Sequence, residues 1–97
     1  MILYIDTSDN KKIVVRLNEL RFVRIIEVGE TQKLLSLIDE IIKKAGTSIN
    51  RIDEIKVNLG PGSFTGLRVG VAVANALGWA LKIPVNGKRQ IVLPRYE

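Results

Sequence analysis

The spacing of hydrophobic positions changes part-way along the chain, which predicts strands first and helices later. Short runs rich in β-branched residues cover Met1 to Asp6, Lys12 to Leu17 and Phe22 to Val28. Such runs are typical of strands, and the short connection at Asn18 and Glu19 favours a hairpin. The first three strands are therefore expected to form an antiparallel meander.

The next segment has the period of an α-helix. From Thr31 to Ala45 the apolar side chains cover an arc of roughly 160° on a helical wheel, and polar side chains fill the rest. This arc is wider than one contact with a sheet requires, so the helix is expected to bury two sides. Gly46 follows as a natural C-cap.

The second half of the chain alternates between strand and helix. Ile55 to Leu59 predicts a fourth strand, Phe64 to Leu81 a second helix, and Pro84-Val85 the start of a last short strand. Strands that follow helical crossovers should be parallel. The order βββαβαβ therefore predicts an α/β fold with a mixed sheet and two helices. It is the order of a single ribonuclease-H-like lobe, the building block of the actin-like ATPases.

The amino-acid composition excludes several classes of chemistry. The chain has 97 residues and contains no cysteine and no histidine, so disulfides, thiolate or imidazole metal sites and catalysis by Ser-His-Asp or Cys-His are excluded. The net charge of +5 permits a phosphate-bearing partner. Lysine and arginine are scattered, however, with Lys88-Arg89 as the one short basic block, and this favours an ordinary basic surface.

The start of the chain and its apolar content predict a cytoplasmic location. No signal-peptide pattern follows Met1. The stretch from Val69 to Leu81 is too short and too rich in glycine for a membrane span, so no contact with a membrane is expected.

The end of the first strand and a glycine-rich loop are weak candidates for phosphate binding. Backbone amides at a helix N-terminus can hold a phosphate, but the glycine spacing matches neither the Walker A loop nor the dinucleotide fingerprint. A tight turn capped by Ser63 and a turn ordered by Asp6 are the favoured interpretation. The candidate residues are Asp6, Thr7, Ser8, Gly60, Gly62 and Ser63.

A nuclease of the ribonuclease-H-like type would need several carboxylates that converge on a divalent metal ion near Asp6. The corresponding tip of the fourth strand, at Asn58, carries no acid. Asp53 and Glu54 precede that strand and are expected at its other end. We therefore expect no catalytic residue, no metal site and no cofactor.

Small residues dominate the second helix and recur at every fourth position. A glycine costs about 1 kcal/mol relative to alanine inside a helix, so this face requires the close approach of another backbone. We expect it to meet a partner together with the first helix, although cover within the monomer stays open. On this prediction Gly70→Leu leaves the monomer folded but abolishes association. The expected partner-facing residues are Leu34, Ile38, Ile41, Gly66, Gly70, Ala74 and Gly78.

Several motifs resemble the first lobe of the TsaB (YeaZ) family, in the same order and at matching spacing. They read MILYIDTS, LLSLIDEIIKKAG, INRIDEIKVNLG, GPGSFTGLRVG and LKIPVNG. The resemblance predicts a TsaB-like N-terminal lobe over residues 1–87, a short C-terminal tail over residues 88–97 and no second lobe. Pro94-Arg95-Tyr96 weakly resembles the Pro-x-Tyr end of family members, whereas Thr31-Gln32 replaces a histidine that some relatives carry.

The resemblance also implies a function. It implies a non-catalytic partner that activates a TsaD-type subunit, which transfers a threonylcarbamoyl group to the anticodon-adjacent adenosine of tRNA. It implies pairing through the two helices, with a second copy in isolation or with the TsaD-type subunit, and at most an indirect contact with tRNA. Two alternatives remain open: a phosphate- or nucleotide-binding module of the actin-like ATPase type, and a degenerate ribonuclease-H-like hydrolase.

Overall fold

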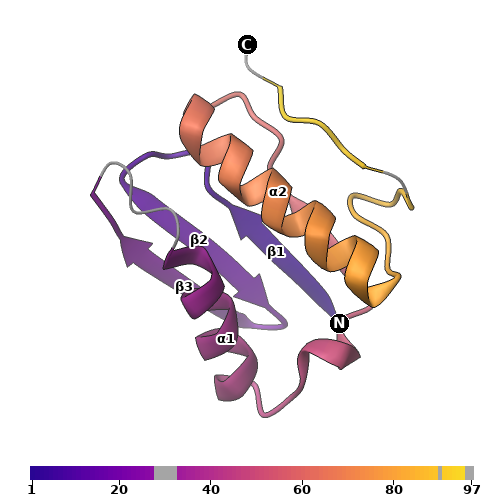
Figure 1. The fold of residues 1–97 in the computed structure, drawn as a ribbon. Helices are drawn as coiled ribbons and strands as arrows, with labels where there is room; N and C mark the ends of the chain where they lie inside the picture. The colour runs from indigo at the N-terminus through magenta and orange to yellow at the C-terminus, as the bar shows by residue number, and fades with distance from the viewer. Residues whose placement is uncertain (28–32, 90, 96–97) are drawn as a thin grey trace.

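The computed structural model describes residues 1–27, 33–89 and 91–95, in which a mixed four-stranded sheet carries two α-helices on one face (Figure 1). The strand order is β3-β2-β1-β4. β1 (Ile2–Asp6), β2 (Lys12–Leu17) and β3 (Leu20–Ile25) form the antiparallel meander, and β4 (Glu54–Val57) pairs with β1 in parallel. The predicted fold class is confirmed.

The hairpin between β2 and β3 is tighter than predicted. Leu17 pairs with Leu20, so a two-residue turn that begins at Asn18 joins the strands. Asn18 has a left-handed backbone (φ +55°), a conformation that asparagine tolerates better than branched residues. β3 therefore begins two residues before the predicted Phe22. Its predicted end, Val28, lies outside the described residues.

The first helix ends where its sequence predicts. α1 (Leu34–Lys44) is followed by Gly46 in the left-handed conformation, with φ +69°. The predicted start at Thr31 lies outside the described residues. A short 3-10 helix, η2 (Ile49–Arg51), then leads into β4.

The second helix, α2 (Phe64–Leu81), has the predicted bounds. The hydroxyl oxygen of Ser63 accepts a hydrogen bond from the amide of Gly66 (3.3 Å), which caps the first turn as predicted. α2 ends at Lys82, whose left-handed backbone (φ +58°) turns the chain away. By length and composition α2 could cross a membrane. In this fold one side of it packs on β1 and β4, and 33% of the helix is buried.

The last predicted strand is reduced to a single position. Val85 forms a parallel bridge with Ile55 and an antiparallel bridge with Lys88. The amide of Ile55 donates to the carbonyl oxygen of Pro84 (3.0 Å), and the amide of Asn86 donates to that of Ile55 (2.8 Å). This segment therefore extends the edge of β4 by one residue instead of forming a fifth strand.

The core lies between the helices and one face of the sheet. α1 packs on β2 and β3, and α2 packs on β1 and β4. The fully buried side chains of this layer include Leu3, Ile5, Ile13, Val15, Leu17, Leu37, Ile41 and Ile55. Both helices therefore turn their remaining side outward on the same face of the molecule.

The described part of the C-terminal segment packs back along α2. The side-chain amide of Asn75 donates to the carbonyl oxygen of Val92 (2.9 Å), and the amide of Val92 donates to the side-chain oxygen of Asn75 (3.1 Å). Val92 is buried. The amide of Arg95 donates to the carbonyl oxygen of Leu59. Figure 1 shows this segment in yellow beside α2.

Candidate functional site

A hydrogen-bonded cluster joins the C-terminal ends of the two parallel strands, β1 and β4. One oxygen of the Asp6 carboxylate accepts from the amide of Ser8 (2.9 Å), from its hydroxyl (2.7 Å) and from the side-chain amide of Asn58 (3.2 Å). The hydroxyl of Tyr4 lies 3.4 Å from the other carboxylate oxygen. Asp6 thus orders the turn after β1 and ties it to β4, as the favoured interpretation of the sequence holds.

Two opposing effects act on the pKa of Asp6. Partial burial disfavours the charged form and alone would raise the pKa. The hydrogen bonds from the Ser8 hydroxyl, the Ser8 amide and the Asn58 amide favour the carboxylate and outweigh burial. The pKa of Asp6 therefore lies below its ordinary value, and the group is ionised at neutral pH.

This shift predicts a contribution of Asp6 to acid sensitivity. Because its folded-state pKa is lower than the unfolded value of about 3.9, the unfolded chain binds more protons in acid, and stability falls as the pH drops below about 4. In Asp6→Asn the part of this loss of stability in acid that Asp6 causes should vanish, and in Ser8→Ala it should be smaller. Urea unfolding between about pH 2 and pH 7 measures it. If Asp6→Asn loses as much stability in acid as the wild type does, Asp6 is not a source of the acid sensitivity.

The glycine-rich loop packs against the turn after β1. The amide of Ser63 donates to the carbonyl oxygen of Ser8 (2.7 Å), and the amide of Gly60 donates to the side-chain oxygen of Asn58 (2.9 Å). A Cβ at Gly62 would lie 2.6 Å from the carbonyl oxygen of Ser8. The loop amides of Gly60 and Ser63 are thus used within the chain, which favours a tight turn over a phosphate cradle.

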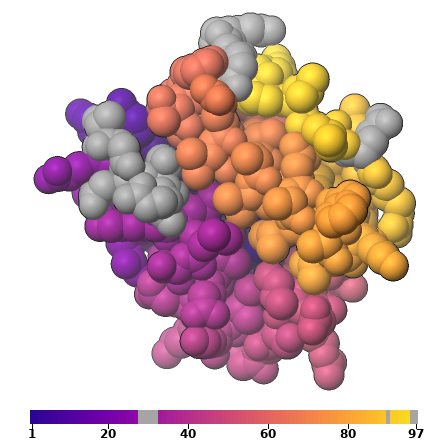
Figure 2. All heavy atoms as spheres, in the orientation of Figure 1, coloured from indigo at the N-terminus to yellow at the C-terminus, as the bar shows by residue number. Residues whose placement is uncertain are grey.

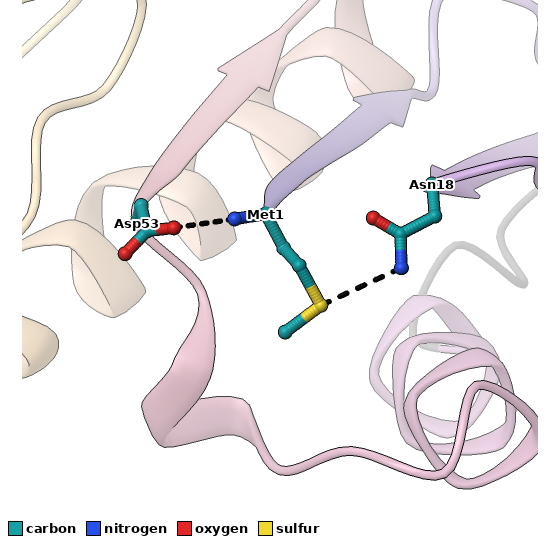
Figure 3. A network of polar contacts seen from close by, with 3 residues as sticks. All are labelled: Met1, Asn18 and Asp53. Atoms are coloured by element: carbon teal, nitrogen blue, oxygen red, sulfur yellow. Dashed lines mark hydrogen bonds and ion pairs between the residues drawn. The ribbon is translucent and has the colours of Figure 1, made fainter.

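The other acids named above lie at the opposite end of the sheet from Asp6. Asp53 precedes β4 and forms an ion pair with the amino group of Met1, while the amide of Asn18 lies 3.5 Å from the Met1 sulfur (Figure 3). Within residues 1–27, 33–89 and 91–95, no three acidic side chains lie together in a way that could hold a metal ion. Asp53 therefore stabilises the start of β1 and β4 and does not converge on Asp6.

The small-residue face of α2 contacts this chain's own fold. A Cβ at Gly66 would lie 2.1 Å from the carbonyl oxygen of Thr7, and one at Gly70 would lie 2.2 Å from the Thr7 hydroxyl oxygen. A Cβ at Gly78 would lie 2.5 Å from the Val85 side chain. The buried Thr7 hydroxyl donates to the carbonyl oxygen of Gly66 (2.6 Å). At Gly66 the second backbone is thus the turn after β1, whereas at Gly70 and Gly78 the close neighbours are the side chains of Thr7 and Val85.

This placement corrects the choice of partner-facing residues. All seven are buried within the single chain, because the period of each helix identifies a face but not the neighbour that it meets. A partner could reach them only if the lobe opened. Gly70→Leu would accordingly disrupt folding and would not test association. The seven residues are Leu34, Ile38, Ile41, Gly66, Gly70, Ala74 and Gly78.

The opposite side of α2 is exposed and almost free of charge. Ala72 and Ala76, which belong to a second line of small residues, are exposed, and Val69 and Val73 beside them are half-buried. Positions three and four apart share one helical face. In Figure 2 α2, in orange, lies at the surface between α1 and the yellow C-terminal residues.

α1 adds one large apolar side chain to this surface. Leu35 is 58% exposed. On the other flank of α1, Glu40 pairs with Arg24 of β3 (2.8 Å), so Leu35 lies on the flank nearer α2. We call Leu35, Val69, Ala72, Val73 and Ala76 the outer helix surface. The sequence pattern indicates part of this surface, because Ala72 and Ala76 lie four positions apart and therefore on one side of the helix.

Comparison with known proteins places the chain in a family. The family described as "TsaD: tRNA N6-adenosine threonylcarbamoyltransferase" matches residues 29–88. The tRNA threonylcarbamoyladenosine biosynthesis protein TsaB of Haemophilus influenzae is 36% identical over 87 residues, which is 87% of this chain and 37% of that protein. YeaZ from Pseudomonas aeruginosa superposes with a TM-score of 0.77 at 32% identity, over 87% of this chain and 41% of that chain. The chain belongs to the TsaB/YeaZ family.

A relative with another name matches a shorter segment. The tRNA N6-adenosine threonylcarbamoyltransferase of Nitrosospira multiformis is 48% identical over 56 residues, or 58% of this chain and 16% of that protein. The TsaB and YeaZ relatives extend over 87% of the chain. The chain spans less than half the length of these relatives and corresponds to the first lobe of full-length family members.

Proposed function

We propose that this chain acts in the formation of threonylcarbamoyladenosine on tRNA as a non-catalytic partner that activates a TsaD-type subunit. Residues 1–87 form the TsaB-like lobe that carries this role, and residues 88–97 are its tail. In isolation the chain pairs with a second copy of itself. We place this function in the cytoplasm.

The outer helix surface is the observation that carries the proposal. It combines small residues at Ala72 and Ala76, which allow another helix to approach closely, with the exposed Leu35. Exposed apolar side chains that gather on one side of a small protein are typical of contact surfaces. Because both helices lie on one face of the sheet, a partner could lay two helices across them.

The geometry around Asp6 supports a non-catalytic role. The one partly buried carboxylate at the end of a central strand accepts hydrogen bonds from Ser8 and Asn58 and holds a turn in place. A catalytic acid or base would need a pKa near the working pH, whereas that of Asp6 is lowered. The amide donors of the neighbouring loop are likewise used within the fold.

Measurement of mass in solution tests the proposal. The purified chain is examined by light scattering over a concentration series, alone and with a TsaD-type subunit. We expect a homodimer that gives way to a one-to-one complex. A chain that stays monomeric and ignores the TsaD-type subunit would overturn the proposal, and binding of ATP or ADP by the isolated chain would then favour the nucleotide-binding alternative.

A further inference from the structure

A groove lies at the C-terminal end of α2, next to the outer helix surface and apart from the cluster around Asp6. The last turn of α2, the segment after it and the chain near Ile91 enclose a volume of about 620 Å³. Ligand pockets commonly have volumes of about 300–1,000 Å³. We call it the Trp79 groove, and the side chains used below are Trp79, Lys82, Ile83, Lys88, Arg89 and Ile91.

The walls of the groove are apolar and unusually open to solvent. The side chain of Trp79 is 86% exposed and that of Ile91 is 73% exposed. Trp79 is the only tryptophan of the chain. A free indole ring at the edge of a concave site offers a flat surface on which another ring can stack.

The charged side chains of the groove all have the same sign. Lys82, Lys88 and Arg89 line it, and none of its described lining residues is acidic. A side-chain nitrogen of Arg89 donates to the carbonyl oxygen of Lys82 (3.0 Å), which holds the two segments together. Like charges gathered in a concave site favour an anionic ligand, because the low-dielectric walls focus their field.

We propose that the Trp79 groove binds a single-stranded segment of RNA, with one base stacked on Trp79 and the neighbouring phosphates held by the three cations. An exposed aromatic ring with flanking cations is the arrangement by which proteins hold single strands. The anionic ligand therefore carries flat rings as well as charge. The choice of RNA over DNA rests on the proposed function, whereas the preference for a nucleic-acid strand rests on the groove alone.

This proposal goes beyond the expectation, drawn from the sequence, of at most an indirect contact with tRNA. The short basic block Lys88-Arg89 is brought beside Trp79 only by the turn at Asn86 and the return of the chain along α2. The groove needs no residue of the outer helix surface. RNA binding and subunit binding are therefore separable.

The fluorescence of Trp79 tests the proposal directly, because no other tryptophan contributes. The full chain, without any TsaD-type subunit, is titrated with an oligouridine RNA of about eight nucleotides, within the range of ~4–16 nucleotides for one binding unit. We expect quenching that saturates. Three phosphate contacts predict that the logarithm of the binding constant falls with the logarithm of salt at a slope of about −2.

Two variants separate stacking from charge, with a fluorescein-labelled RNA and anisotropy as the readout. Trp79→Ala should weaken binding roughly 5- to 150-fold at an unchanged salt slope. Lys82→Gln with Lys88→Gln should reduce the slope to about −0.7. Both changes lie on exposed side chains, so circular dichroism should be unchanged.

Matched controls remove an aromatic ring or two charges elsewhere. Phe64→Ala, at the other end of α2, is expected to bind RNA as the wild type does. The same holds for Arg21→Gln with Lys44→Gln, which lowers the net charge by the same amount on other surfaces. If this control pair weakens binding as much as the groove pair, binding reflects overall charge and the proposal is wrong.

Other occupants of the groove give distinct results. A mononucleotide that binds as tightly as the oligomer would mean a nucleotide pocket, and a poly-glutamate peptide that binds more tightly than RNA would mean an acidic protein partner. A Trp79 spectrum that shifts with protein concentration and no longer responds to RNA would mean that a second copy of the chain fills the groove. Each of these outcomes overturns the RNA assignment. None bears on complex formation with a TsaD-type subunit, which light scattering measures separately.

Discussion

Gly66→Ala should lower the free energy of unfolding by roughly 3 kcal/mol, although alanine is the better helix former by about 1 kcal/mol. The new Cβ would lie 2.1 Å from the carbonyl oxygen of Thr7. That oxygen belongs to the backbone of a buried turn and cannot rotate away. α2 would have to move off β1, which opens the contact that the Thr7 hydroxyl makes with Gly66.

Thermal and urea unfolding measure this loss. For a domain of this length, roughly 3 kcal/mol lowers Tm by more than about 10 °C. Thr65→Ala is the matched control, since Thr65 is exposed in the same turn of the same helix and outside the outer helix surface, so the change should alter stability by about 0.5 kcal/mol or less. A Gly66→Ala protein more stable than the wild type would show that helix propensity dominates and that α2 does not approach the turn this closely.

The local elements of this fold are predictable because their signals lie within short segments. The bounds of α2 follow from the cap at Ser63 and from an apolar run that ends before Lys82. β2 follows from its β-branched residues. β3 begins two residues before its predicted start because Leu20 and Arg21 carry no strong strand signal of their own. They belong to the strand because they pair with β2 across the turn at Asn18.

The direction in which a helix faces is harder to predict. The repeat of Gly66, Gly70 and Gly78 indicates close packing, and at Gly66 the neighbour is another backbone. Nothing local identifies that backbone as the turn at Thr7, about sixty positions earlier in the chain, because the contact depends on the parallel pairing of β1 with β4. Contact with a partner chain would require the same spacing of small residues. Only the packed fold therefore distinguishes contact within the chain from contact with a partner.

The Trp79 groove has no counterpart in the sequence pattern for a related reason. Trp79 in a helix of apolar residues has the pattern of a core side chain, but it is 86% exposed because it lies on the outward side of α2, whereas the adjacent Gly78 is buried. Lys88 and Arg89 come beside it through the bridge at Val85. A groove made of segments that meet only in three dimensions leaves no periodic signal.

Ala76→Arg should abolish association with a TsaD-type subunit while leaving the lobe folded. Ala76 is an exposed position of the outer helix surface, so an arginine there can extend into solvent in the free chain. In a close helix–helix contact the same side chain would separate the helices or leave a charge buried without a partner. Truncating one side of a buried charge pair costs about 2–5 kcal/mol, so we expect affinity to fall by roughly 100-fold or more.

Calorimetric titration against the TsaD-type subunit measures this loss, and the unfolding curve of the variant shows that its lobe remains intact. Asn50→Arg in η2 adds the same charge at an exposed position off the outer helix surface and should bind as the wild type does. Wild-type affinity in Ala76→Arg would place the contact elsewhere on the lobe. A loss in both variants would mean that net charge governs binding. A loss in Ala76→Arg alone requires the outer helix surface to be the contact, because that variant leaves the cluster around Asp6 untouched.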